Sequence, residues 1–293
     1  MRPILTASQL RRKRRDRAWF QWIQRSEKYR ARVELAIRRY FLTERARVMR
    51  VLSRVALRAA DAELEDQTAP FSEVPLIELR RKLEEQLEDN NDDWEESLLL
   101  LLLATAASFT GLITFDLEFD FDDLEDQSNV RTPTPIPVAT ETWTRQFIEA
   151  ALALIAATTL KKILSIIVDA QQKKQSVPAT ITSINEAYER FIRNRAPGIA
   201  SDLVGKVASM AQQIAILQLP VPVEDIRQTW ISMRDKFVRD SHDALDGQTR
   251  KFGEEFKPGL KFPRDPNAPI EESINCRCWL MIEQVRKAKP KAA

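Results

Sequence analysis

The sequence predicts a mainly α-helical protein, in which an elongated N-terminal helical region is followed by a small α+β C-terminal domain. Only six of the 293 residues are glycine, and glycine-dependent turns are what dense β-structure needs. Apolar residues recur every three or four positions over long stretches, which is the helical period. The C-terminal part departs from this pattern, because residues 230–280 hold half of the glycines, both cysteines and the one histidine.

The first predicted division is a helical N-terminal region over residues 1–130. A long helix is expected over 8–60, because its apolar side chains are spaced by three, four or their sums, with arginines between them. The apolar positions that define this helix include Trp19, Ile23, Val33, Ile37 and Phe41.

The Pro70–Pro75 stretch ends this pattern, and a second amphipathic helix is expected from about Leu76 to Leu87, ending in the polar run 88–96. Residues 98–115 follow without a single charge, which is close to the minimum length for a membrane span. Their flanks are acidic and carry no Lys or Arg anchor, which favours a helix buried in a bundle or an oligomer. Insertion into a membrane is the alternative.

A Pro/Thr-rich linker over residues 131–140 is the clearest boundary in the sequence. Before it, residues 116–126 alternate acidic and apolar side chains, as in a short edge strand or a solvated acidic loop. After it, a helical segment is expected over 141–220, and its first long helix, 143–172, has Thr142 as the expected N-cap.

Two further helices are predicted within that segment, over residues 181–195 and 199–217. Pro197 and Gly198 are expected to separate them, because proline interrupts a helix and glycine favours its end. The remaining residues, 221–285, form the predicted C-terminal domain.

Charge is distributed in blocks. Residues 1–60 carry 18 Lys and Arg against 4 Asp and Glu, whereas residues 61–130 carry 3 against 21. Such blocks usually form interaction surfaces. The basic arm at the start is followed by aromatic residues, which suits the phosphate backbone of DNA, bound without sequence specificity, or the acidic surface of a protein partner. A solvated helix face is the plainer interpretation. The residues of this basic arm are Arg11, Arg12, Lys13, Arg14, Arg15 and Arg17.

The most informative segment runs from Trp230 to Trp279. Its motifs occur in the order W-x3-R-D-x3-R-x2-H-x3-D-G, F-x-P-G, P-x-D-P and N-C-R-C. This order resembles the C-terminal domain of the phage Mu F-like head-morphogenesis family, and the resemblance covers roughly residues 180–282. The site residues that it singles out are Trp230, Arg234, Asp235, Arg239, His242, Asp246, Gly247, Asn275, Cys276 and Cys278.

The resemblance implies a minor head protein, an internal virion component that associates with the portal protein and with the capsid or scaffold. It would be present in the host cytoplasm during assembly and in the phage head afterwards, and would act in prohead assembly, DNA packaging or ejection. The implied mechanism is binding, so no enzyme activity is expected. The alternative for 98–115 is a membrane-active ejection protein.

One cluster of side chains is expected around the single histidine. Arg239, His242 and Asp246 are spaced by three and four, so they share a face if they lie on one helix that ends at Gly247. A cation, an imidazole and a carboxylate would then occupy one neighbourhood.

The cysteines extend this cluster if Asn275–Cys278 folds back against it. Cys276 and Cys278 are one residue apart, and a disulfide between them would close a strained ring, so we expect reduced thiols and folding in a cytoplasm. Two interpretations stay open: a buried polar network that pins the loops, or a zinc site formed by His242, Cys276 and Cys278, with Asp246 as a further candidate. Otherwise no cofactor is expected.

An ADP-ribosyltransferase-like enzyme is the alternative function, because the Mu F-like domain resembles a compact α+β fold related to those transferases. Family members often carry an Ile-Ala-Arg-Thr-Glu-like segment before the tryptophan. The matching segment here, Ile199–Leu203, lacks the Arg and the Glu, and Asp202 lies one residue early, about 100° off the face on a helix. This departure favours an inactive descendant.

Overall fold

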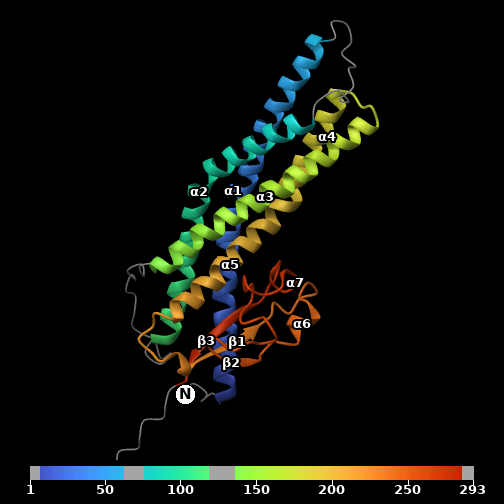
Figure 1. Ribbon diagram of the computed structural model, residues 1–293. Helices are drawn as coiled ribbons and strands as arrows, with labels where there is room; N and C mark the ends of the chain where they lie inside the picture. The colour runs from blue at the N-terminus through green and yellow to red at the C-terminus, as the bar shows by residue number, and fades with distance from the viewer. Residues whose placement is uncertain (1–6, 63–75, 119–135, 286–293) are drawn as a thin grey trace, which may run out of the picture. The chain divides into compact units, whose positions relative to one another are not determined.

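The computed structural model describes residues 7–62, 76–118 and 136–285 (Figure 1). Over these ranges the chain is mainly helical, with a small three-stranded antiparallel sheet near the C-terminus, which confirms the predicted fold class at this level. The helices are α1 (Ala7–Ala62), α2 (Leu76–Glu118), α3 (Val138–Gln172), α4 (Val177–Arg190), the π-helical η3 (Phe191–Arg195), α5 (Ala196–Ile216), the 3-10 turn η4 (Val223–Asp225), α6 (Asp240–Asp243) and α7 (Ile270–Ser273). The strands are β1 (Ile226–Ile231), β2 (Thr249–Lys251) and β3 (Trp279–Gln284).

The chain forms two compact units, each assembled from segments that are distant in sequence. The sheet unit comprises Met1–Ala31, Leu102–Thr142 and Ser201–Ala293, and the helical unit comprises Arg32–Leu101 and Trp143–Ala200. Helices α1, α2, α3 and α5 therefore each contribute residues to both units. The Pro70–Pro75 stretch, the alternating residues after Glu118 and the linker up to residue 135 lie outside the described residues.

The helical unit has an apolar core supplied by one face of each helix. Val33, Ile37 and Phe41, which the helical period of 8–60 predicted, are among them, and α1 is a single helix over that range. The predicted apolar positions Trp19 and Ile23 belong to the sheet unit, where Trp19 is exposed. Side chains buried in this unit include Val33, Ile37, Phe41, Leu52, Leu79, Leu83, Leu98, Ile155, Ile163, Ile167 and Ile184.

Helix α2 continues through the polar run 88–96, so the predicted helix end there is wrong. The run faces α1 within the helical unit: the Tyr40 hydroxyl donates a hydrogen bond to Asn91 Oδ1 at 2.8 Å, and Arg47 forms a salt bridge with Asp93. Tyr40 and Arg47 are distant from this run in sequence. The sequence of residues 88–96 alone therefore gives no sign that the run forms a helix packed on α1. The acidic block thus pairs in part with the basic block.

Helix α3 begins at Val138, five residues before the predicted start, so Thr142 is not its N-cap. The amides of Thr140 and Glu141 donate to the Pro137 carbonyl at 2.8 and 3.1 Å, which closes the first turn directly after the proline. A proline that precedes a helix loses nothing there, because the first amides of a helix have no partner within it.

Pro197 and Gly198 do not separate two helices, which corrects the second boundary prediction. Helix α4 begins after Ser176, whose hydroxyl accepts a hydrogen bond from the Ala179 amide, and the π-helical η3 then leads directly into α5. A wider π turn just before Pro197 provides room for its ring and for its missing hydrogen bond, so the helical path continues.

The uncharged stretch 98–115 is largely buried as far as its side chains are described, with Leu98, Leu102 and Phe109 fully enclosed. Among the described residues, α3 is the helix that is long and apolar enough to cross a membrane by length and composition, with a mean hydropathy of 1.9 over a window that is 39% buried. The core helix of a soluble bundle meets the same criterion.

The sheet unit is built on β1, the central strand in the order β2-β1-β3, drawn orange to red in Figure 1. Both pairings are antiparallel, with Thr229 opposite Thr249 on one side and Met281 on the other. Successive side chains alternate between the two faces, as a strand requires. Trp230 and Leu280 face a core formed with the C-terminal loops, whereas the neighbouring odd-numbered positions face another core.

That other core is formed by side chains from three helices and the sheet. Trp22 from α1 stacks on Trp279 with ring centroids 5.6 Å apart, and it meets Phe109 from α2 edge-on at 4.5 Å. Ala208 from α5 and Ile231 from β1 complete the group. Both faces of the small sheet are therefore covered, so the C-terminal strands depend on helices from other parts of the sequence.

Candidate metal centre

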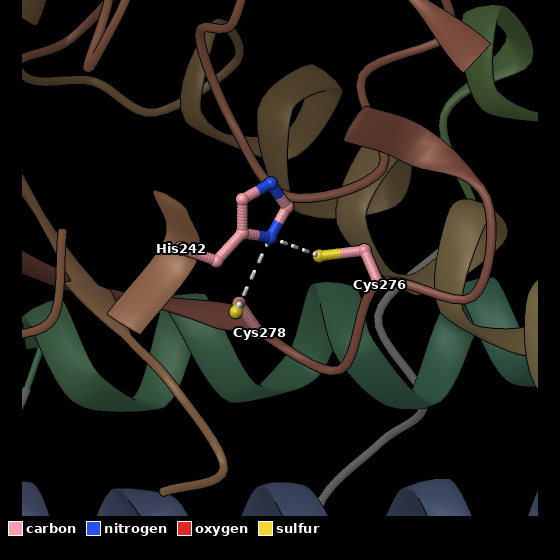
Figure 2. Close-up of side chains that lie close together, drawn as sticks. All are labelled: His242, Cys276 and Cys278. Carbon is pink, nitrogen blue, oxygen red and sulfur yellow. Dashed lines mark hydrogen bonds between the residues drawn. The ribbon is translucent and has the colours of Figure 1, made fainter. Parts of the chain in front are cut away.

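His242, Cys276 and Cys278 meet in the interior of the sheet unit, and each of the three side chains is 1% exposed. The imidazole Nδ1 lies 3.4 Å from Cys276 Sγ and 3.8 Å from Cys278 Sγ. Figure 2 shows both sulfur atoms facing this same ring nitrogen. The structure thus brings together the three residues that the sequence suggested as zinc ligands.

The short helix α6 places the imidazole. Arg239 precedes this helix with extended backbone angles, and its guanidinium donates to the Ile274 carbonyl, which ties the α6 loop to the cysteine loop. The ring of Trp230 packs edge-on against the His242 ring at 5.2 Å. A buried imidazole held between an aromatic ring and a tied loop has little rotational freedom.

A tight turn places the thiols. The Cys276 amide donates to the Ser273 carbonyl at 3.4 Å, Ile274 has φ −66° and ψ 137°, and Asn275 has φ 51°. These are the angles of a type II turn, whose third position requires positive φ and so takes Gly or Asn. The asparagine of the N-C-R-C motif has a backbone reason to be there.

The spacing of the two cysteines also has a geometric reason. Cys276 and Cys278 lie on either side of Arg277 just before β3, and both sulfur atoms reach the imidazole Nδ1. Arg277 between them points elsewhere and forms a salt bridge with Asp235 at 2.9 Å. The Cys-x-Cys spacing therefore brings two thiols to one point.

Glu272 completes the surroundings of the histidine, and the sequence analysis did not identify it. Its Oε2 lies 2.8 Å from His242 Nε2, and its Oε1 accepts from Lys257 Nζ at 2.5 Å. The hydrogen bond from Lys257 is the main cause that lowers the pKa of Glu272, and His242 adds to it. The carboxylate therefore stays ionised and fixes the imidazole with Nδ1 directed at the thiols.

The two thiols have divergent proton affinities. The hydrogen bond from Cys278 lowers the pKa of Cys276 well below its usual range, with further contributions from His242 and the positive charge of Arg264. The same thiol–thiol hydrogen bond, together with burial, raises the pKa of Cys278. The pair is thus arranged to hold a thiolate at Cys276, and a thiolate is the form of cysteine that ligates metal.

The two nitrogen–sulfur distances, 3.4 and 3.8 Å, are close to those of a tetrahedral zinc site. With Zn–S near 2.3 Å and Zn–N near 2.0 Å, the ligand nitrogen and a sulfur are separated by about 3.5 Å, and two sulfurs by about 3.8 Å. The three candidate ligand atoms here all lie within 4.8 Å of one another. A ligating histidine usually donates its other ring N–H to a carboxylate, which is the position that Glu272 occupies.

Asp246 does not share the neighbourhood of His242, so that part of the predicted cluster is wrong. Helix α6 is a single turn that ends at Asp243, and the chain does not keep helical spacing as far as Asp246. The Asp246 carboxylate instead accepts from the Ser232 amide at 2.9 Å and from Arg234 at 2.8 and 2.7 Å. It links the end of β1 to the loop before Gly247.

Gly247 has positive φ (79°), and its amide donates to the Trp230 carbonyl at 2.8 Å, so it turns the chain back toward β2. Asp202, the displaced acid of the Ile199–Leu203 segment, pairs with Lys206 at 2.8 Å and accepts from the Asn275 amide at 3.3 Å. In this chain Asp202 therefore supports the cysteine turn.

The basic arm lies on the first turns of α1. Lys13 and Arg17 are exposed and Arg15 is partly exposed, while the side chains of Arg11, Arg12 and Arg14 lie outside the described residues. Of the aromatic residues that follow, Trp19 and Phe20 are exposed and Trp22 is buried in the core beneath the sheet. Aromatic side chains thus remain on the surface beside the basic residues.

No protein-family model matches the chain, and no curated protein or solved structure matches it either.

Proposed function

We propose that this chain is a bacteriophage minor head protein of the Mu F-like head-morphogenesis family. It acts inside the virion by binding the portal protein, with contacts to the capsid or scaffold and to packaged DNA, and it performs no catalysis. Its place is the host cytoplasm during assembly and the phage head afterwards.

One observation carries this proposal: residues from the beginning and the end of the motif series support one buried centre. Trp230 packs on His242, Arg239 fixes the carbonyl beside Asn275, and the cysteines of N-C-R-C meet the imidazole. Motifs separated by more than 30 residues would not be expected to converge in this way if their order were accidental.

We further propose that His242, Cys276 and Cys278 hold a structural zinc ion. The ligand distances, the ionised Glu272 behind the imidazole and the thiolate character of Cys276 favour zinc over a metal-free polar network. The ion would fasten the α6 loop to the cysteine turn where the sheet provides few backbone hydrogen bonds.

The zinc proposal is tested by adding cobalt(II) to the metal-free full chain. Thiolate ligation gives an intense charge-transfer absorption that zinc abolishes by displacing cobalt. We expect this absorption in the native chain and its loss in Cys276→Ser and in His242→Gln. Absence of thiolate absorption in the folded native chain would refute the zinc site.

The head-protein proposal is tested by co-expressing the chain with the portal protein from the same genome and isolating the portal ring. We expect the chain to co-purify with the ring at a fixed ratio. A matched variant with Arg15 and Arg17 replaced by Gln reports on the basic arm, and one with the exposed Lys161 and Lys162 replaced by Gln serves as the control. Failure of the native chain to associate with the ring would contradict the proposal.

The transferase alternative has one observation in its favour, since Glu272 supplies a carboxylate next to His242. Its oxygens are engaged by the imidazole and by Lys257, and its partner nitrogen is buried, which leaves little access for a substrate. Calorimetric titration with NAD at millimolar concentration distinguishes the two functions, because the head-protein proposal expects no binding heat.

A further inference from the structure

Arg264 occupies a position in the sheet unit that is unusual for an arginine. The Asp265 amide donates to the Phe262 carbonyl at 3.2 Å, which closes a four-residue turn with Pro263 second and Arg264 third. Arg264 has φ 61°, a left-handed conformation that such turns normally assign to glycine or asparagine. A disfavoured backbone at a non-glycine residue suggests that its side chain is needed there.

The guanidinium of Arg264 is buried away from any carboxylate of the described residues. The residue is 6% exposed, and its Nε has no hydrogen-bond partner among the described residues. No carboxylate in the described ranges forms a salt bridge with it. A buried guanidinium with five donors ordinarily has acceptors for them, because an unpaired buried charge is strongly destabilising.

Gly205 leaves the space that this guanidinium fills. It lies inside α5, where glycine is less favourable than alanine, and a Cβ atom at this position would overlap the guanidinium of Arg264. The chain has only six glycines, and Gly205 lies in the interior of α5, where this helix contacts the guanidinium of Arg264.

The guanidinium also borders a pocket of about 330 Å³ within the sheet unit. Three of the lining residues are arginines and one is a glutamate, a formal charge of +2. Arg30 pairs with Glu27 at 2.6 Å and Arg277 pairs with Asp235 at 2.9 Å, so Arg264 is the cation left for a ligand. The pocket is lined by Trp22, Ile23, Ser26, Glu27, Arg30, Ser201, Val204, Gly205, Met233, Arg264 and Arg277.

We propose that this pocket binds the phosphate group of a small phosphorylated molecule, anchored by the Arg264 guanidinium. A phosphate monoester is an anion at neutral pH with three terminal acceptor oxygens, and the planar guanidinium fork of Arg264 fits two of them. The serine hydroxyls at positions 26 and 201 supply further donors. A carboxylate would bring one charge and fewer acceptors.

The walls and the volume limit what the phosphate is attached to. Trp22, Ile23, Val204 and Met233 form an apolar side next to the cations, which suits a compact organic group. About 330 Å³ lies at the lower end of the range for ligand pockets, which suits a small phosphate monoester.

The test uses the full chain and two probes, inorganic phosphate and phenyl phosphate, in calorimetric titration and in thermal melting at constant ionic strength set with sodium chloride. We expect saturable binding of phosphate and a rise in Tm that chloride does not produce. Equal affinity for both probes identifies recognition of the phosphate alone, and tighter binding of phenyl phosphate assigns the organic group to the apolar wall. Both results support the proposal.

Two variants and one control localise the site. Gly205→Ala favours the helix while displacing the guanidinium, and Arg264→Gln removes the charge; each is expected to weaken phosphate binding at least tenfold. Arg193→Gln, an exposed arginine of the other unit, is expected to bind as the native chain does. If Arg264→Gln does not fold, Gly205→Ala decides. No saturable binding to the native chain, or undiminished binding to Gly205→Ala, would overturn the proposal and leave the head-protein proposal untouched.

Discussion

The imidazole Nε2 of His242 lies 2.8 Å from the carboxylate of Glu272, on the opposite side of the ring from the two thiols. A neutral imidazole whose Nε2–H donates to this carboxylate presents the lone pair of Nδ1 to the sulfurs, which is the form that ligates a metal. The residue that sets the state of the ring therefore comes from α7, thirty residues beyond the histidine.

Replacing Glu272 by glutamine is expected to lower zinc affinity about 10- to 100-fold, the usual effect of losing a partner behind a ligating histidine. The measurement is competition for zinc against a chromophoric chelator. Glu271→Gln changes the exposed neighbour on the same helical turn and serves as the control. Equal affinity of the two variants would show that the carboxylate does not act on the metal site.

Changing Asn275 to valine is expected to destabilise the protein by about 2 kcal/mol, because a β-branched side chain resists the left-handed conformation. Asn275→Gly keeps that conformation available and is expected to change the free energy of unfolding by less than about 0.5 kcal/mol. Urea unfolding of both variants gives the comparison. Similar destabilisation of the two would argue against the type II turn.

The helical unit contains a carboxyl group that titrates near neutrality. Glu44 is fully buried, and desolvation raises its pKa to about 7, although hydrogen bonds from Tyr40 and Tyr188 oppose the shift. The folded state thus holds this proton more tightly than the unfolded chain does. Its contribution to stability is complete below pH 4.5 and is lost as pH rises toward and past 7.

We therefore expect the unfolding free energy to fall by about 3 kcal/mol from this group between pH 4.5 and 8, at about 1.36 kcal/mol per pKa unit. Glu44→Gln, which still accepts the Tyr188 hydroxyl, should remove this part of the pH dependence. Glu149→Gln alters an exposed acid of the same unit and should leave it intact. Denaturation at pH 5 and pH 8 measures the difference, and an unchanged slope in Glu44→Gln would count against the assignment.

For the basic arm, affinity for duplex DNA is expected to fall steeply with salt, because each neutralised phosphate releases counterions. Replacing Arg15 and Arg17 by glutamine should reduce the slope of log K against log [NaCl] by roughly 0.9 for each phosphate that is no longer neutralised. Fluorescence anisotropy at about 50 to 200 mM NaCl is the measurement. A flat response in the native chain would indicate a protein partner instead.

The helical period alone was enough to predict α1 and the general helical character, since it records burial of one face along a local segment. It failed where distant residues decide the outcome. The polar run 88–96 suggested a helix end, because the sequence does not show that Tyr40 and Arg47 contact it. Pro197 suggested a break between two helices, because the sequence does not reveal the π turn that precedes it.

The candidate site shows the same division. The motif order predicted that Cys276 and Cys278 would join His242 if Asn275–Cys278 folds back, and the structure brings the three together. Asp246 was misplaced because the helix after Arg239 ends within one turn. Glu272 and Arg264 carry no local pattern that distinguishes them from other surface charges, so their roles emerge once their burial and partners are known.

The stacking of Trp22 on Trp279 has a consequence for biosynthesis. The sheet cannot close its covered face until two aromatic rings 257 positions apart have both been translated, which at ordinary ribosomal speed takes on the order of tens of seconds. During that interval Trp22 is an exposed apolar side chain on the nascent helix, without its aromatic partner. A fragment that contains only the C-terminal strands would lack the helices that cover this face of the sheet. Trp279 and Ile231 would then be exposed to water and would promote aggregation.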